Sequence, residues 1–120
     1  SNSTSSFGTH IGIKLILLDM LDAISGIESF IYGLSETEFL SDTKTQAAVE
    51  RYLEILGEAA NKLPDIVYQH NQQIEWHKII SLRNRIIHAY FDVNKAIIWN
   101  IAKKFLPKLK DDLEKIVSKY

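Results

Sequence analysis

Apolar residues recur at three- and four-residue steps along almost all of the chain from Ile11 onward. This spacing places them on one face of an α-helix, whereas a half-buried β-strand requires alternation with a period of two. No segment alternates in that way over the length of a strand. The sequence therefore predicts an all-α fold: an antiparallel four-helix bundle with one or two short extra helices.

Local signals divide the first half of this pattern into helices. Gly33 is suited to ending the first long helix, and Ser35 with Glu38 forms the capping-box pattern of a short helical turn. Asp42 is suited to capping a second long helix, which must end before Pro64. The small residues around position 57 of this second helix predict a close approach by a neighbouring helix.

The second half of the chain is divided in the same way. A short helical turn is expected within 65–73, and a third long helix is expected to start at Trp76 and end near Phe91. Asn94 is suited to capping the last helix. Pro107 lies inside that helix and predicts a kink, because it cannot donate the usual backbone hydrogen bond.

Length and composition limit the class of protein. A chain of 120 residues suffices for one hydrophobic core, and we expect a flexible Ser/Thr-rich tail over 1–10 followed by a helical domain over 11–120. The absence of cysteine excludes a disulfide framework and thiolate chemistry. The first apolar run, Leu15 to Leu18, ends at Asp19 and is too short to span a membrane. We expect a cytoplasmic protein that does not contact a membrane.

Charge is distributed unequally between the two halves. Residues 1–65 contain ten acidic and four basic side chains, whereas the chain from Glu75 onward contains five acidic and ten basic ones. A basic surface on the second half could bind a phosphate backbone, although solvated helix faces give similar counts.

The segment Ser81–Phe91 carries more polar side chains than a buried helix usually tolerates. On a helical wheel of about 100° per residue, one arc is purely apolar and consists of Ile79, Leu82, Ile86 and Ala89. The other arc mixes apolar with polar side chains, namely Ile80, Ile87, Phe91, Asn84 and His88. We expect the first arc to pack in the core of the chain and the second to be a contact surface that contains a chemical site.

Arg83 and His88 are suited to cleaving RNA. A histidine that titrates near neutral pH can move a proton from a ribose 2′-hydroxyl or to a leaving 5′-oxygen. A guanidinium can bind the phosphate and offset the charge that grows in the transition state. These roles suffice for cleavage by internal transesterification without a metal. Because the two side chains point roughly 140° apart on one helix, two copies related by a dyad would have to share the site.

Each polar residue also has a structural interpretation. His88 could be a core histidine with satisfied hydrogen bonds, and Tyr90 a core tyrosine whose hydroxyl reaches solvent. Asn84 could cap or bridge helices, and Arg85 could be either solvated or a phosphate contact at the rim of the site. On this interpretation the chain is a helical dimerisation protein. The combination of all these residues in one short segment favours a functional site.

A metal site is not favoured by the sequence. His70 and His77 are seven positions apart, and no carboxylate stands at a fixed spacing that would complete a metal site. No glycine-rich phosphate loop or nucleophile elbow is present either. We therefore expect neither a metal nor a cofactor.

The pattern Arg83-Asn84-x-x-x-His88-x-Tyr90 resembles the Arg-x4-His-x-Tyr motif of HEPN-domain toxins, specifically the HepT-like ribonucleases. The resemblance extends to the flanking segments 33–49 and 51–64 and covers about residues 11–118. Arg85 and Ala89 depart from the residues common in relatives, and both changes make the motif more positive. Glu75 replaces an expected proline and affects only the start of the helix.

The resemblance implies a function as well as a fold. It implies a homodimer formed through the motif helix, with Arg83 and His88 as catalytic residues and Asn84 and Arg85 in support. It also implies the toxin of a toxin–antitoxin system, neutralised by an MntA-like minimal nucleotidyltransferase that transfers AMP onto Tyr90. The alternative is a non-catalytic HEPN module that binds nucleotide or substrate for a nucleotidyltransferase.

Overall fold

The structure is a computed structural model that describes the backbone of residues 2–88 and 94–120 and the side chains of 10–86 and 94–120. The described residues form seven α-helices and one π-helical turn, in agreement with the all-α prediction. The elements are α1 (Asn2–Ile31), α2 (Glu36–Leu40), α3 (Thr43–Asn61), α4 (Asp65–His70), α5 (Trp76–His88), α6 (Lys95–Asn100), η1 (Ile101–Phe105) and α7 (Leu106–Val117).

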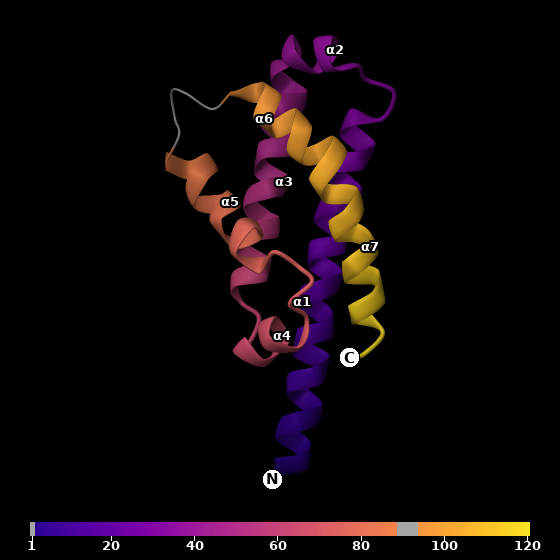
Figure 1. The fold of residues 1–120 in the computed structure, drawn as a ribbon, viewed down its shortest axis with the longest axis vertical. Coiled ribbons are helices and arrows are strands. Elements are labelled where there is room, and N and C mark those ends of the chain that lie inside the picture. The colour runs from indigo at the N-terminus through magenta and orange to yellow at the C-terminus, as the bar shows by residue number, and fades with distance from the viewer. Residues whose placement is uncertain (1, 89–93) are drawn as a thin grey trace.

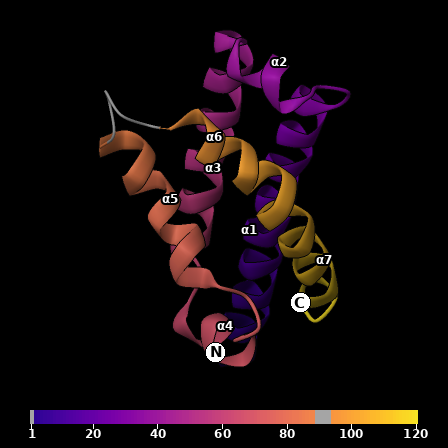
Figure 2. The same cartoon turned by 45° about the horizontal axis from the view of Figure 1, so that its top comes forward.

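Four long helical segments form an antiparallel bundle (Figure 1). Helix α3 is central, because it packs against α1 on one side and against α5 on the other. Helix α7 packs against α1, and α6 lies next to α2 and α3 (Figure 2). Helix α5 therefore contacts the bundle mainly through α3.

The core is formed by the apolar stripes that the sequence predicted. Its largest fully buried side chains come from six of the helices: Leu17, Met20, Ile24, Ile27, Phe39, Leu53, Leu56, Ile79, Ile98, Leu106, Leu113 and Ile116. Phe39 packs against Trp99, with ring centroids 5.2 Å apart. This contact ties α2 to α6 across the top of the bundle.

Four of the predicted helix boundaries are confirmed. Gly33 follows α1 with a φ of 76°, a conformation that other residues adopt only at a cost. Ser35 and Glu38 form the reciprocal capping box of α2, and the Asp42 side chain accepts a hydrogen bond from the Thr45 amide at the start of α3. The Asn94 side chain caps α6 through the Ala96 amide.

Two expectations about the helices are corrected: the start of the first long helix and the continuity of the last one. Helix α1 begins at Asn2 rather than at Ile11. Extending an existing helix costs less than nucleating one, and His10 is anchored by edge-on contact with the Tyr120 ring, at 5.6 Å between centroids. The division of the chain into a tail and a domain at residue 10 stays a prediction.

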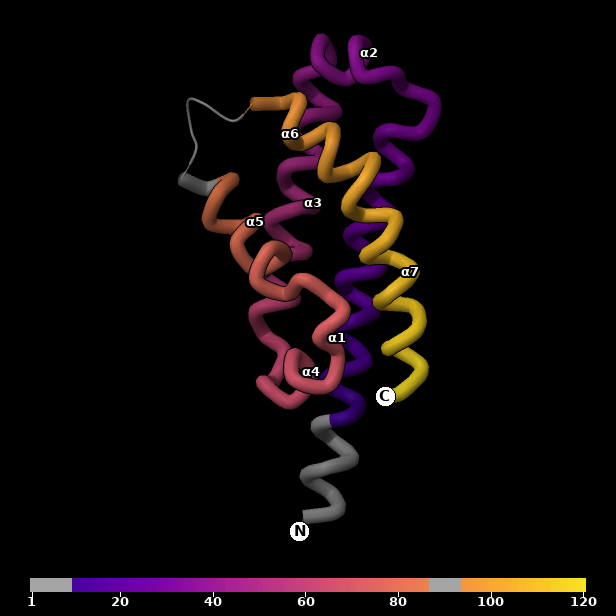
Figure 3. Tube along the Cα trace, in the orientation of Figure 1, coloured from indigo at the N-terminus to yellow at the C-terminus, as the bar shows by residue number. Residues whose placement is uncertain are grey.

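The last predicted helix is divided into α6, η1 and α7, which follow one another along one continuous path (Figure 3). The wider π turn ends directly before Leu106, and Pro107 then occupies the first turn of α7. Proline is tolerated in the first turn of an α-helix, because an N–H at that position has no carbonyl partner within the same helix. Ile97 on this segment is apolar but 46% exposed.

No helix among the described residues is both long enough and apolar enough to cross a membrane.

Candidate functional site

The motif helix α5 has one face in the core and another face at the surface, as its sequence predicts. Ile79 and Leu82 are 0% and 4% exposed and Ile86 is half-buried against the core, which confirms the packing of this arc as far as it is described; Ala89 lies outside the described residues. The three consecutive residues Arg83, Asn84 and Arg85 are all exposed. Ile80, from the mixed arc, is half-buried and contacts the edge of the core. The described polar residues of the motif thus lie on the surface of α5, while the opposite face of the helix packs in the core.

Gly57 determines how closely α5 approaches α3. A Cβ atom on Gly57 would lie 3.0 Å from the Arg83 backbone nitrogen, 3.0 Å from the Ile79 carbonyl oxygen and 3.3 Å from the Arg83 Cβ. These are backbone or near-backbone atoms, which cannot move unless the whole helix shifts. The close approach predicted around position 57 is confirmed, and it occurs at the motif arginine.

Glu58, the next residue on α3, forms an ion pair with Arg83. The Oε1 atom of Glu58 lies 3.6 Å from the Nε atom of Arg83, and the two side chains are 49% and 45% exposed. At this separation the contact is an ion pair between charged groups rather than a hydrogen bond. Among the described residues, Glu58 is the acidic partner of the arginine that the sequence singles out.

Glu58 also lines a hollow between α1 and α3. The hollow is bordered by Ile16, Asp19, Asp22, Ala23, Tyr52, Ile55, Glu58, Ala59 and Lys62. Three carboxylates and one ammonium group give this surface a negative charge. The negative first half of the chain therefore reaches the edge of the positive motif.

The start of α5 is fixed by a buried asparagine. Asn71 is fully buried; its side-chain amide donates to the Val67 carbonyl at 2.8 Å and accepts from the Lys119 ammonium at 3.0 Å. The Asn71 carbonyl in turn accepts a hydrogen bond from the indole of Trp76, the first residue of α5. These bonds join α4, α5 and the last residues of the described chain.

Tyr68 also holds the start of α5 in place. Its ring packs against that of Trp76, with centroids 5.4 Å apart, and its hydroxyl donates to the Ala60 carbonyl at 2.7 Å. Burial, with a smaller contribution from Asp65, raises the pKa of Tyr68 above its ordinary value. The hydroxyl therefore stays protonated and remains a hydrogen-bond donor.

The segment 89–93 contains Tyr90 and lies outside the described residues, as does the predicted end of α5 near Phe91. His88 lies within α5, but its side chain is outside the described set. On the far side of this segment, Lys95 at the start of α6 is ion-paired with Glu50 of α3. Helix α3 thus contacts the helices on both sides of the segment that carries Tyr90.

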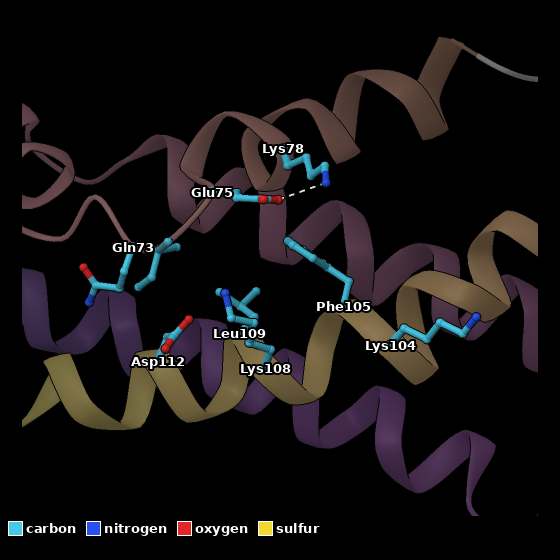
Figure 4. A pocket seen from close by; sticks show the side chains of 9 residues that line it. Gln73, Glu75, Lys78, Lys104, Phe105, Lys108, Leu109 and Asp112 are labelled. Carbon is cyan, nitrogen blue, oxygen red and sulfur yellow. Dashed lines mark ion pairs between the residues drawn. The ribbon is translucent and has the colours of Figure 1, made fainter.

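A second hollow lies between the start of α5 and the η1–α7 segment (Figure 4). Its charged residues are Lys78, Lys104 and Lys108 with Glu75 and Asp112. Lys78 is paired with Glu75 at 2.9 Å, and Lys104 points away from that pair in Figure 4. Because the charges nearly balance, this hollow is a weaker candidate for binding a polyanion than the exposed arginines of α5.

Within the described part of the chain, no group of three or more His, Cys, Asp or Glu side chains could hold a metal ion. His70 and His77 are both exposed.

Sequence reasoning identified Arg83, Asn84 and Arg85 as surface residues of α5 but missed Glu58 as the partner of Arg83. Glu58 could have been found from its position directly after Gly57, because a neighbouring helix was expected to approach at that point.

Comparison with known proteins gives a consistent result. The family model described as "Ribonuclease HepT-like" matches residues 20–116. A Thermococcus cleftensis protein named "Probable ribonuclease HepT" is 39% identical over 103 residues, which cover 86% of this chain and 94% of that protein. A Methanocaldococcus jannaschii protein named "Putative RNase" is 36% identical over 105 residues, 88% of this chain and 87% of its own length. No solved structure gave a significant match.

Proposed function

The chain belongs to the HepT-like ribonuclease family, and we propose that it is a metal-independent endoribonuclease whose catalytic residues are Arg83 and His88. The observation that carries this proposal is the match to ribonucleases over nearly the whole chain, together with the exposure of Arg83 on a helix that α3 holds in place.

The proposed reaction is an internal transesterification. His88 would accept the proton of the ribose 2′-hydroxyl as its oxygen attacks phosphorus, or protonate the departing 5′-oxygen. The P–O5′ bond breaks as the new P–O2′ bond forms, which leaves a 2′,3′-cyclic phosphate and a 5′-hydroxyl. Arg83 would bind the phosphate through bidentate hydrogen bonds and offset the charge of the transition state.

Asn84 and Arg85 are proposed to support this chemistry. Asn84 would orient the histidine or the phosphate, and Arg85 would contact a phosphate at the rim of the site. Both residues are exposed, which leaves them accessible to a polyanion. DNA lacks the 2′-hydroxyl and should resist cleavage.

We further propose that the site is formed by a homodimer through α5. Arg83 and His88 point roughly 140° apart on the helix, so one copy cannot easily direct both side chains at one phosphate. The exposed residues Arg83, Asn84 and Arg85 belong to the side of α5 that does not pack in the core. A dyad next to this side would bring Arg83 of one copy toward His88 of the other.

The regulator is proposed to be a nucleotidyltransferase antitoxin of the MntA type. The Tyr90 oxygen would attack the α-phosphorus of ATP, forming a phosphodiester to AMP and releasing pyrophosphate. The added negative charge and bulk would oppose RNA binding at the adjacent arginines by repulsion and occlusion.

Cleavage of end-labelled RNA in the presence of EDTA tests the proposal. A metal-independent ribonuclease cleaves RNA under these conditions and leaves the equivalent DNA intact. A non-catalytic binding module would retain RNA or nucleotide without cleaving it, and a purely structural dimer would bind neither. Either of the last two results would contradict the proposal.

A further inference from the structure

We propose that Glu58 is a positioning residue for Arg83. The Glu58 carboxylate holds the Arg83 guanidinium at its Nε edge, and the two Nη groups then face the RNA phosphate. The inference rests on the proposed function, because it requires Arg83 to bind the phosphate that is cleaved.

The first support is the geometry of the pair. Glu58 Oε1 lies 3.6 Å from the Nε atom of Arg83, on the side of the guanidinium nearest to the helix backbone. Arginine carries five N–H groups, one on Nε and four on the two Nη atoms. A carboxylate near Nε therefore leaves the outer Nη edge available for a bidentate phosphate contact. Carboxylate and phosphate would occupy different edges and need not compete.

The second support is that both side chains start from fixed backbone. Gly57 precedes Glu58 on α3, and its Cα lies against the backbone of Arg83 and Ile79 on α5. The two helices are therefore in contact at the point from which both side chains emerge. An ion pair between two such helices restricts the guanidinium more than a partner on a loop would.

The third support is that stability alone is a poor explanation for this carboxylate. Both side chains are about half exposed, and exposed ion pairs contribute little to stability. With Asp19 and Asp22, Glu58 adds negative charge to the surface bordering the motif. This charge should weaken RNA binding by repulsion. Orientation of Arg83 gives Glu58 a role that offsets this cost.

The two effects, loss of orientation and loss of repulsion, act on different kinetic constants. Removing the charge of Glu58 should lower kcat, because the guanidinium is no longer held in one orientation. The same change should leave KM for RNA unchanged or lower it, because a repulsive charge has gone. A residue that merely supports folding would not separate kcat from KM in this way.

The test compares Glu58→Gln with Glu54→Gln in the full chain. Glu54 is the matched control, because it lies one turn earlier on α3 and forms an ion pair with Arg51 at 3.2 Å. Both variants lose one negative charge and one ion pair, but only the first loses the partner of Arg83. We expect kcat to fall about tenfold or more for Glu58→Gln, since small misplacements of catalytic groups are costly. Glu54→Gln should stay within about twofold of the wild type in both constants.

A second comparison uses Arg83→Ala. In that background Glu58→Gln should cause no further fall in activity, because the side chain that it positions is absent. Circular dichroism and gel filtration of each variant establish that fold and assembly are retained.

The outcomes separate this inference from the proposed function. If the wild type cleaves RNA and Arg83→Ala cleaves it more slowly at a measurable rate, an unchanged kcat in Glu58→Gln overturns the positioning role alone. A rise in KM without a fall in kcat also overturns it. If the wild type cleaves no RNA, the proposed function fails and the inference fails with it.

Discussion

Gly57 on α3 lies against the backbone of Arg83 on α5, at a distance where a Cβ atom would be 3.0 Å from the Arg83 nitrogen. The packing of the core and the presentation of the motif arginine thus depend on the same contact. A change that separates the two helices should affect stability and activity together.

Gly57→Ala should lower the free energy of unfolding. The added methyl group meets backbone atoms of α5, and overpacking of this kind costs about 1–3 kcal/mol. Part of that cost is offset by the better helix propensity of alanine, about 1 kcal/mol. Urea unfolding monitored by circular dichroism measures the net change, and RNA cleavage should fall in parallel.

Gly12→Ala is the control for this substitution. Apart from its chain neighbours and the adjacent backbone of α1, no heavy atom of the described residues lies within 4 Å of a Cβ built on Gly12, which is also inside a helix. Here only the propensity effect remains, and stability should rise by about 0.5–1 kcal/mol. Equal changes in the free energy of unfolding for Gly57→Ala and Gly12→Ala would show that the contact of Gly57 with α5 does not limit the packing.

Asn71→Ala should destabilise the start of α5. Asn71 is fully buried, and its loss leaves the Val67 carbonyl and the Lys119 ammonium without their partner. Lys119 is exposed and its ammonium can be solvated, but leaving the buried Val67 carbonyl unsatisfied costs about 1–3 kcal/mol. Thermal unfolding measures the change. Gln72→Ala removes an exposed amide one residue later and should change stability by less than about 0.5 kcal/mol.

Asp42 should make stability depend on pH. Its hydrogen bonds with Thr45 hold the pKa of the carboxyl below the ordinary value of 3.8. A depressed pKa in the folded state means that the contribution is fully present above pH 3.8 and is lost as the pH falls through the folded-state pKa. Unfolding midpoints measured at a series of pH values should therefore fall more steeply in the wild type than in Asp42→Asn, whose amide caps without titrating. If the unfolding midpoints of the wild type and of Asp42→Asn fell in parallel with pH, the cap would not be the cause of the lowered pKa.

His88→Ala should abolish RNA cleavage while the protein remains folded. Loss of a general acid or base typically costs about 10²–10⁴-fold in rate. His77→Ala provides the control on the same helix, because His77 is exposed in the first turn of α5 and should leave the rate unchanged. Undiminished cleavage by His88→Ala would exclude His88 from the mechanism.

Tyr90→Phe should prevent AMP transfer without preventing cleavage. Incubation with ATP and an MntA-type nucleotidyltransferase, followed by intact-mass measurement, should show AMP on the wild type and none on the variant. Tyr32→Phe is the matched control, because Tyr32 directly follows α1, is 88% exposed and should not alter the modification. AMP on Tyr90→Phe would assign the modification to another residue.

Much of the fold could be predicted from particular residues. The period of the apolar positions indicated helices, and Gly33, Ser35, Asp42 and Asn94 marked their ends, because capping is a local interaction between residues close in sequence. The π turn over Ile101–Phe105 was not predicted, since a proline indicates a break but not the register by which the chain accommodates it. The start of α1 at Asn2 was missed because a Ser/Thr-rich stretch carries no periodic signal.

The sequence by itself determined the helical class, the helix ends and the motif that places the chain among HepT-like ribonucleases, because these depend on residue type and short spacing. Only the tertiary structure decided that Glu58 lies beside Arg83 and that Gly57 lies beneath it. Positions 57 and 58 are far from position 83 along the chain, and no local rule relates them. The contact arises from the way α3 and α5 pack, which is set by the shape of all the side chains between them.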